Sequence, residues 1–243
     1  MRYFIFSDIH ANLEAFAAVL ADANRRDYDV ALSLGDHVGY GANPNECIDT
    51  FRRLENSAAL RGNHDTAVLD PNERVFFNAD AYSAIVHTAK RLTDDSKKFL
   101  EELPLLYNAS KSFIGVHATP SQPASWGYIL DSLEAETAFQ AMTCQVAFTG
   151  HSHIPCVFIE GQRVQSLQAG DTVPLEAGTK YIINAGSVGQ PRDRDPRAPY
   201  IIFDDEEMTV HFYRVEYDWN KASTKIIAAG LPTALAQRIL VGL

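Results

Sequence analysis

Histidine, aspartate and asparagine recur in five short segments of this sequence, most of which directly follow an apolar run. Six of the eight histidines fall within or beside these segments. Imidazole nitrogens, carboxylates and amide oxygens, without thiolates, are the ligands of borderline divalent metal ions. The pattern therefore predicts a metal centre. The segments are Asp8-Ile9-His10, Gly35-Asp36, Gly62-Asn63-His64-Asp65, His117 and Gly150-His151-Ser152-His153.

The candidate ligands are too numerous for a single ion. One ion rarely takes seven protein ligands when it must also leave positions for water and substrate. We therefore expect two divalent metal ions, with Mn, Fe, Ni, Co and Zn as the candidates, a pair suited to attack on phosphorus. The seven candidate ligands are Asp8, His10, Asp36, Asn63, His117, His151 and His153.

The elements that must position these residues alternate between strand and helix in the first half of the chain. Residues 2–6, 30–34 and 57–60 have the composition of buried strands, and helical spacing of apolar residues follows the first two. Such alternation indicates a parallel sheet, and ligand sites gather at the carboxyl ends of its strands. The loops that carry the candidate ligands are therefore expected to converge.

The second half of the chain changes character. Residues 71–104 are predicted to be helical, as are residues 132–142 and the segment from 219 onward. Because no flexible linker separates the halves, we expect one domain over residues 1–243, with a helical insertion at 71–104, C-terminal helices at 219–243 and two packed sheets. The predicted strands lie at 112–116, 145–149, 157–159, 163–167, 181–183, 200–203 and 209–213.

Charge and hydrophobicity limit the partners. Lysine and arginine total 21 against 31 acidic residues, which gives a net charge of −10. Such a balance argues against a nucleic-acid coat protein. No apolar stretch approaches the roughly 18 residues of a membrane span, and the start of the chain lacks a secretory signal, so we expect a cytoplasmic protein with no membrane partner. The oligomeric state is left open.

The five segments, in this order, resemble the signature of the calcineurin-like metallophosphoesterase superfamily. The blocks DIH, GD, GNHD, the histidine of GVH, and GHSH cover about residues 1–155, and NAGSVGQPRDRDPRAPY extends the resemblance to small bacterial members to about residue 204. The resemblance implies an α/β fold in which two mixed sheets form a sandwich flanked by helices. It also implies hydrolysis of phosphodiester or phosphomonoester bonds through a metal-bridging hydroxide.

The resemblance further implies a role for each matched residue. One ion would be held by Asp8, His10, Asp36 and His153, and the other by Asp36, Asn63, His117 and His151, so that Asp36 bridges the two. His64 matches a histidine near the leaving-group oxygen, and Asp65 is its candidate orienting partner.

The sequence departs from some branches of the family. Where serine/threonine phosphatases and symmetrical dinucleoside tetraphosphate hydrolases carry GDxVDRG, this chain has GDHVGYG and lacks their arginine. Arg192 is the leading candidate for a contact to phosphate, with Arg194 and Arg197 as rivals. The backbone amides of residues 186–189 are further candidates.

The expected partner is a small phosphate ester, with nucleotides among the candidates. Tyr40, Trp126 and Tyr128 could stack on a base or an aryl group, although packing is the alternative. The alternatives to the main reading are a dinucleoside polyphosphate hydrolase, a nuclease, or a non-catalytic scaffold of the same fold. The full ligand set together with His64 favours catalysis over the scaffold.

Overall fold

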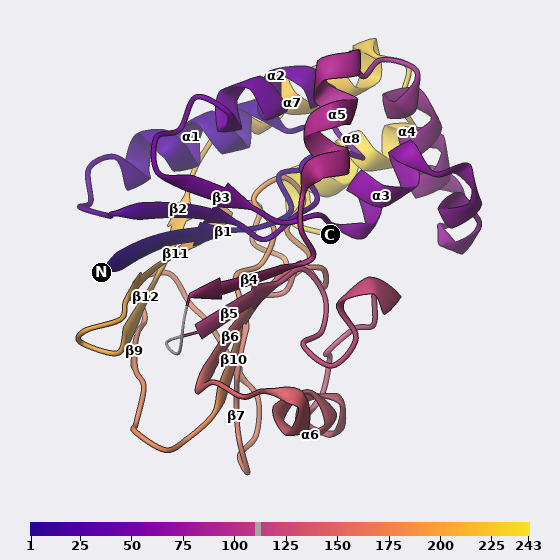
Figure 1. The fold of residues 1–243 in the computed structure, drawn as a ribbon. Helices are drawn as coiled ribbons and strands as arrows, with labels where there is room; N and C mark the ends of the chain where they lie inside the picture. The colour runs from indigo at the N-terminus through magenta and orange to yellow at the C-terminus, as the bar shows by residue number, and fades with distance from the viewer. Residues whose placement is uncertain (110–112) are drawn as a thin grey trace.

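Two sheets packed face to face form the centre of the protein, and helices cover their outer faces (Figure 1). The computed structural model describes residues 1–109 and 113–243, so that Ser112, at the start of one predicted strand, lies outside the described residues. Each sheet has six strands within these ranges and mixes parallel with antiparallel neighbours. The predicted sandwich of two mixed sheets flanked by helices is confirmed.

The first sheet joins the two ends of the chain. Its order is β3-β2-β1-β11-β12-β9, and β1 pairs in parallel with β2 and antiparallel with β11. The first three strands run parallel, which places the loops that follow them at one edge. The strands are β1 (Arg2–Phe6), β2 (Val30–Ser33), β3 (Ser57–Ala59), β9 (Thr172–Pro174), β11 (Ala198–Asp204) and β12 (Thr209–Val215).

The second sheet has the order β4-β5-β6-β10-β7-β8, with β5, β6 and β10 parallel. Sequence analysis did not predict β4 or β9, which are short and partly exposed and therefore lack a continuous apolar run. The strands are β4 (Leu106–Ala109), β5 (Phe113–Val116), β6 (Val146–Thr149), β7 (Cys156–Ile159), β8 (Gln165–Ser166) and β10 (Tyr181–Asn184).

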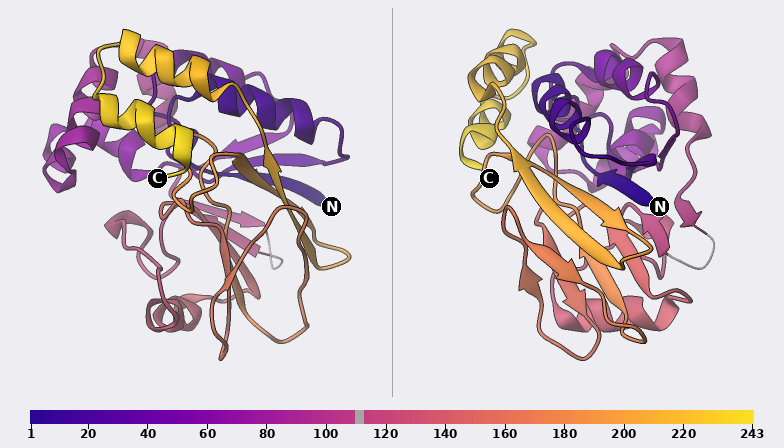
Figure 2. Two further views of the ribbon diagram at one scale, coloured as in Figure 1. Left: turned by 180° about the vertical axis from the view of Figure 1, so that it is seen from behind. Right: turned by 90° about the vertical axis from the view of Figure 1, so that its left-hand side faces the viewer.

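Most helices cover the first sheet, whereas α6 (Ser132–Ala141) covers the second. The two C-terminal helices pack against each other, and α7 also contacts α1, as seen from behind in Figure 2. Among the described residues, no helix combines the length and apolar character needed to span a lipid bilayer. The helices over the first sheet are α1 (Leu13–Ala23), α2 (Pro44–Phe51), α3 (Asn63–Leu69), α4 (Ala79–Ala89), α5 (Asp94–Glu102), α7 (Trp219–Ala228) and α8 (Thr233–Val241).

The helix starts follow from local capping chemistry. Thr93 Oγ1 accepts a hydrogen bond from Ser96 N at 3.1 Å and so caps the start of α5. The segment Gly62-Asn63-His64-Asp65, predicted as a loop, instead begins α3, because Gly62 N donates to the Asp65 carboxylate at 3.0 Å. The 3₁₀ helices η1 (Pro71–Phe76) and η2 (Pro123–Ser125) lie in the connections that follow α3 and β5.

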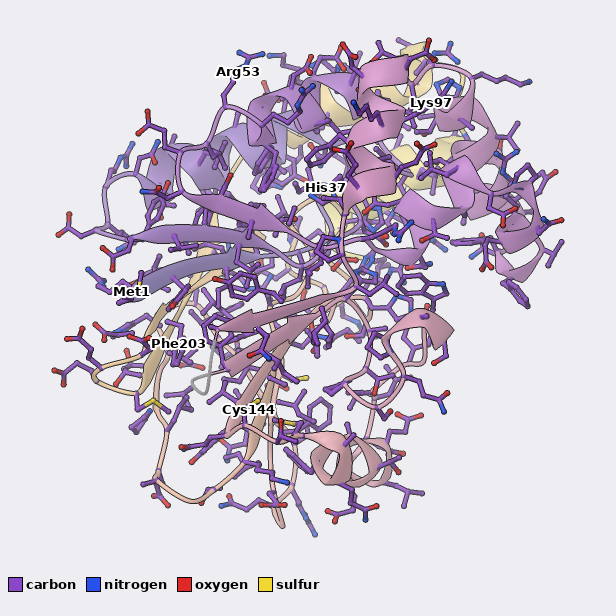
Figure 3. All side chains as sticks on the ribbon, in the orientation of Figure 1. Met1, His37, Arg53, Lys97, Cys144 and Phe203 are labelled. Carbon is purple, nitrogen blue, oxygen red and sulfur yellow. The ribbon has the colours of Figure 1, made fainter. Side chains whose placement is uncertain are left out.

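The core between the sheets is aromatic. The ring of Phe203 lies 5.5 Å from that of Phe113 and 5.1 Å from that of Phe148, and Figure 3 shows Phe203 between the two sheets. Strand β1 is buried on both faces, with Ile5 in this core and Phe4 in the cluster beneath the helices. Packing on both faces fixes the position of β1, and with it the loop that carries Asp8.

Candidate metal centre

The seven predicted ligands converge at the carboxyl ends of the strands. They come from the loops after β1, β2, β5 and β6 and from the first turn of α3. All are buried except Asn63, which is half-buried. Five of them have a backbone in the left-handed region, which residues other than glycine rarely adopt and which clusters at functional sites. These five are Asp8, His10, Asp36, His151 and His153.

Each of the two carboxylates uses one oxygen for the backbone and turns the other into the site. Asp8 Oδ2 accepts a hydrogen bond from His151 N at 3.0 Å, and Asp36 Oδ1 accepts one from His64 N at 2.8 Å. Asp8 Oδ1 and Asp36 Oδ2 are buried and have no hydrogen-bond partner in the described parts of the chain. Burying an unpaired carboxylate oxygen is costly, so this arrangement fits a bound cation.

The histidines are held with one ring nitrogen free to bind a metal. In three of them Nδ1 lies within hydrogen-bond distance of a backbone carbonyl, which fixes the proton there and leaves a lone pair on Nε2. The Nε2 atoms of His10 and His153 lie 3.0 Å apart. Two lone pairs at that distance repel each other unless a cation lies between them. The three Nδ1–carbonyl pairs are His10 with Val38 at 3.0 Å, His117 with Leu34 at 3.1 Å and His153 with Gln190 at 2.7 Å.

A second group of candidate ligands lies next to the first, and Asp36 borders both. His117 Nε2 is 3.1 Å from Asn63 Oδ1 and 3.4 Å from Asp36 Oδ2, which is itself 3.6 Å from His10 Nε2. His151 is held the other way round, because its Nε2 donates to the Trp126 carbonyl at 2.9 Å and so leaves Nδ1 available.

The pKa values of the histidines reflect their burial and, for His117, the nearby carboxylates. Burial lowers the pKa of His151 and of His153 to about 3, which keeps both imidazoles neutral, as a metal ligand must be. Burial also acts to lower the pKa of His117, but the Asp36 and Asp8 carboxylates outweigh it and raise that pKa to about 9. The same two anions would attract a divalent cation.

His64 borders this group and faces the cleft. Its ring packs 4.5 Å from that of Tyr40 and 4.8 Å from that of Phe77. Its Nδ1 atom is buried without a hydrogen-bond partner among the residues described. Burial, followed by the neighbouring His10, holds the pKa of His64 well below its usual value, so the ring is neutral.

Asp65 does not contact His64 through a hydrogen bond among the residues described. Its carboxylate accepts from His37 N at 2.9 Å and from Gly62 N at 3.0 Å, and lies 3.1 Å from His37 Nδ1. His37, labelled in Figure 3, is fully buried, and its ring bonds to Ser33 and Asp65 rather than to the candidate metal ligands. The Asp65 carboxylate therefore joins the start of α3 to the loop after β2, which is a positioning role.

Of the three rival arginines, Arg192 keeps its charge available. Its Nη2 donates to Tyr40 Oη at 3.1 Å and to Gln190 Oε1 at 3.0 Å, and it forms no ion pair within the described ranges. Arg197 is neutralised by Asp195 at 2.6 Å. Arg194 is exposed and does not line the cleft that Arg192 borders.

The backbone amides of residues 186–189 are largely occupied within the protein, contrary to expectation. Gly186 N donates to Asn184 Oδ1, Val188 N to the Ser7 carbonyl and Gly189 N to the Asp8 carbonyl, each at 2.9 Å. This loop therefore fixes the backbone of Asp8, and these three amides are not available to a phosphate group.

A cleft of about 730 Å³ opens beside the candidate ligands. Its walls come from the connection between α3 and α4, from the segment around η2 and from α8. Several of its residues were missed by sequence analysis because they lie in no motif. The missed residues are Glu73, Phe76, Phe77, Asn78, Ala81, Ala124, Ser125, Arg238 and Leu243.

Comparison with known proteins agrees with this geometry. Residues 1–208 match the family model of the calcineurin-like phosphoesterase superfamily domain. An uncharacterized protein of Methanocaldococcus jannaschii is 40% identical over 241 residues, covering 98% of this chain and 97% of the relative. A crystal structure of a metallophosphoesterase from Sphaerobacter thermophilus is 35% identical, with a TM-score of 0.90 and full coverage of both chains.

A hypothetical protein of Pyrococcus horikoshii shares the fold, with a TM-score of 0.82 at 19% identity over 100% of this chain and 98% of its own. The chain therefore belongs to the calcineurin-like phosphoesterase superfamily. It is a hydrolase of phosphate esters from a metal-dependent family, and its buried carboxylates and histidines form candidate metal-binding groups.

Proposed function

We propose that this protein hydrolyses phosphodiester or phosphomonoester bonds with two divalent metal ions. The observation that carries the proposal is the convergence of unpaired Asp8 Oδ1 and Asp36 Oδ2 on histidine nitrogens whose other ring atom is already bonded. One ion is held by Asp8, His10, Asp36 and His153, and the other by Asp36, Asn63, His117 and His151, with Mn, Fe, Co, Ni or Zn as the candidates.

The side chains of the protein divide the remaining work. When bound, the two ions supply an activated water molecule and positive charge against the phosphoryl oxygens. Arg192 directs a charge-assisted hydrogen bond at a phosphoryl oxygen. His64, neutral in its buried setting, donates a hydrogen bond from Nε2 to the oxygen of the leaving group. The carbonyls that hold the histidines keep the ligands in place and so limit reorganisation during the reaction.

The proposal is tested by removing and restoring metal. We expect the chelated protein to be inactive, and the protein reloaded with Mn²⁺ to bind about two equivalents and to hydrolyse at least one class in a panel of esters. The panel contains phosphomonoesters, cyclic and linear phosphodiesters, and dinucleoside polyphosphates. Binding of metal without turnover on any of them would favour a scaffold, and full activity after chelation would contradict the proposal.

Replacing Arg192 by alanine is expected to raise KM while the metal content stays unchanged. A charge-assisted hydrogen bond in a half-buried site contributes about 1.5–3 kcal/mol, which corresponds to a KM roughly 10- to 150-fold higher. Arg197→Ala is the matched control, because Asp195 already neutralises that guanidinium. If Arg194→Ala or Arg197→Ala raises KM and Arg192→Ala does not, the phosphate contact lies elsewhere on the loop.

A further inference from the structure

The cleft is much larger than a phosphate group, and aromatic residues line both of its walls. Phe76 of η1 borders one wall, and Trp126 and Tyr128 from the segment after η2 border the other. Figure 1 shows the connection between α3 and α4 opposite the segment that precedes α6. A cavity of about 730 Å³ lies in the range that holds a whole small-molecule ligand.

The aromatic side chains on these walls are open to solvent. Phe76 is 80% exposed and Tyr128 is 47% exposed. One face of the Tyr128 ring stacks on His151, with centroids 4.0 Å apart and planes at 17°, so the exposed area belongs to its remaining surface. A flat group placed there would continue a stack that begins at a metal ligand.

Trp126 has a backbone conformation that its residue type disfavours. Its φ is 55° and its ψ is 33°, in the left-handed region, where a bulky side chain is an outlier. The hydrogen bond from His151 Nε2 to the Trp126 carbonyl opposes this cost and holds the backbone of Trp126 beside the candidate metal centre. Strain of this kind is characteristic of ligand clamps.

Polar groups border the same cleft and could form hydrogen bonds with the edge of a flat ring. Asn78 Oδ1 caps α4 by accepting from Ala81 N at 3.0 Å, which leaves the side-chain amide protons of Asn78 for a ligand. Glu73 lines the cleft and forms no ion pair in the part of the chain described. A bound acyl chain would desolvate this carboxylate without pairing it, whereas the amino group of a base could donate to it.

We propose that the substrate is a nucleotide ester whose phosphate lies at the metal centre and whose base stacks on Phe76, Trp126 and Tyr128. This inference rests on the proposed function and names the substrate class of that site. Stacking of a base on aromatic side chains has no strict sequence preference, so the walls select for a base over an aliphatic group rather than for one particular base.

The test compares two ligands that differ only in the base. The probes are the 5′-phosphonate analogues of adenosine monophosphate and of ribose phosphate, whose carbon–phosphorus bonds resist hydrolysis. The chain has two tryptophans, and Trp219 lies outside the cleft, where its Nε1 donates to the Pro196 carbonyl. In a Trp219→Phe variant loaded with metal, quenching of Trp126 fluorescence therefore reports binding directly.

We expect the adenosine analogue to bind about 10- to 100-fold more tightly than the ribose analogue and to quench the fluorescence of Trp126. Phe76→Leu, made in the Trp219→Phe protein, should remove most of this difference. Trp126→Leu, followed by calorimetry, should do the same. Val75→Ala is the matched control, because Val75 is adjacent and 75% exposed but does not line the cleft.

Equal affinity for the two probes, or a preference unchanged by both variants, would overturn the inference. Tighter binding of octylphosphonate than of the adenosine analogue would overturn it in favour of an acyl chain. Failure of the proposed function is separate, because it would appear as no hydrolysis of any ester in the panel by the Mn-loaded wild-type protein, whichever probe binds better.

Discussion

Asp36→Asn is expected to lower turnover by roughly 10³-fold or more, because the charge that metal ions contribute to the transition state is worth several kcal/mol. Asp36 Oδ2 lies near both His117 Nε2 and His10 Nε2, at 3.4 and 3.6 Å. An amide can still accept the hydrogen bond from His64 N through its oxygen, so the substitution mainly removes charge. Both ions would therefore be weakened at once.

The measurements are bound metal after dialysis and turnover at saturating substrate. His153→Ala provides the comparison, because His153 Nε2 faces Asp8 Oδ1 at 3.1 Å and belongs to one group of ligands only. Asp94→Asn, at an exposed position in α5, is the control for loss of a carboxylate elsewhere. If Asp36→Asn retains two ions and near-native turnover, Asp36 does not bridge them.

His64→Ala is expected to lower turnover on the order of 10²–10⁴-fold for nucleotide or alkyl esters and distinctly less for p-nitrophenyl esters. An alkoxide is a poor leaving group and gains from a hydrogen-bond or proton donor as the bond breaks, whereas p-nitrophenolate leaves without help. His64 borders the cleft, and no hydrogen bond within the described residues occupies its ring.

Metal content is measured alongside turnover, because the backbone N of His64 donates to the carboxylate of the candidate ligand Asp36 at 2.8 Å. The alanine variant keeps this backbone hydrogen bond, so we expect its metal content to be unchanged. Equal losses on both classes of ester would assign His64 to charge stabilisation or to the geometry of the metal site. Unchanged turnover on both would show that the ring has only a packing role beside Tyr40 and Phe77.

The sequence by itself was sufficient to predict the family, the fold class and the set of candidate ligands. The candidate ligands lie in short blocks whose spacing reflects local constraints, such as a tight turn directly after a buried strand. The periodicity of apolar residues predicted the alternating strands and helices of the first half, because β1 and β2 are buried apolar runs and α1 has a regular apolar face. Patterns of this kind involve residues that are close together in the chain, so they can be recognised from the sequence alone.

The pairing and register of the strands are determined only by the tertiary structure. Strand β11 pairs with β1 across about 200 residues, with Arg2 opposite Asp204, and no local pattern encodes that choice. The edge strands β4 and β9 were missed because they are short and half-exposed. Their place in the sheets depends on neighbours from distant parts of the chain.

The tertiary structure also decided which polar residues are available for chemistry. Asp65 looks like a partner for His64 in the sequence, yet the start of α3 turns its carboxylate toward His37 and Gly62. Arg192 and Arg197 are equivalent by type, but a nearby carboxylate neutralises only Arg197.

The cleft walls depend on tertiary structure for the same reason. Phe76, Trp126 and Arg238 come from three distant segments and meet only because the sheets bring those segments to one edge. Sequence fixes which groups exist and how the nearest of them are spaced. Long-range pairing and burial determine which of those groups meet, because they depend on contacts that no local window of residues contains.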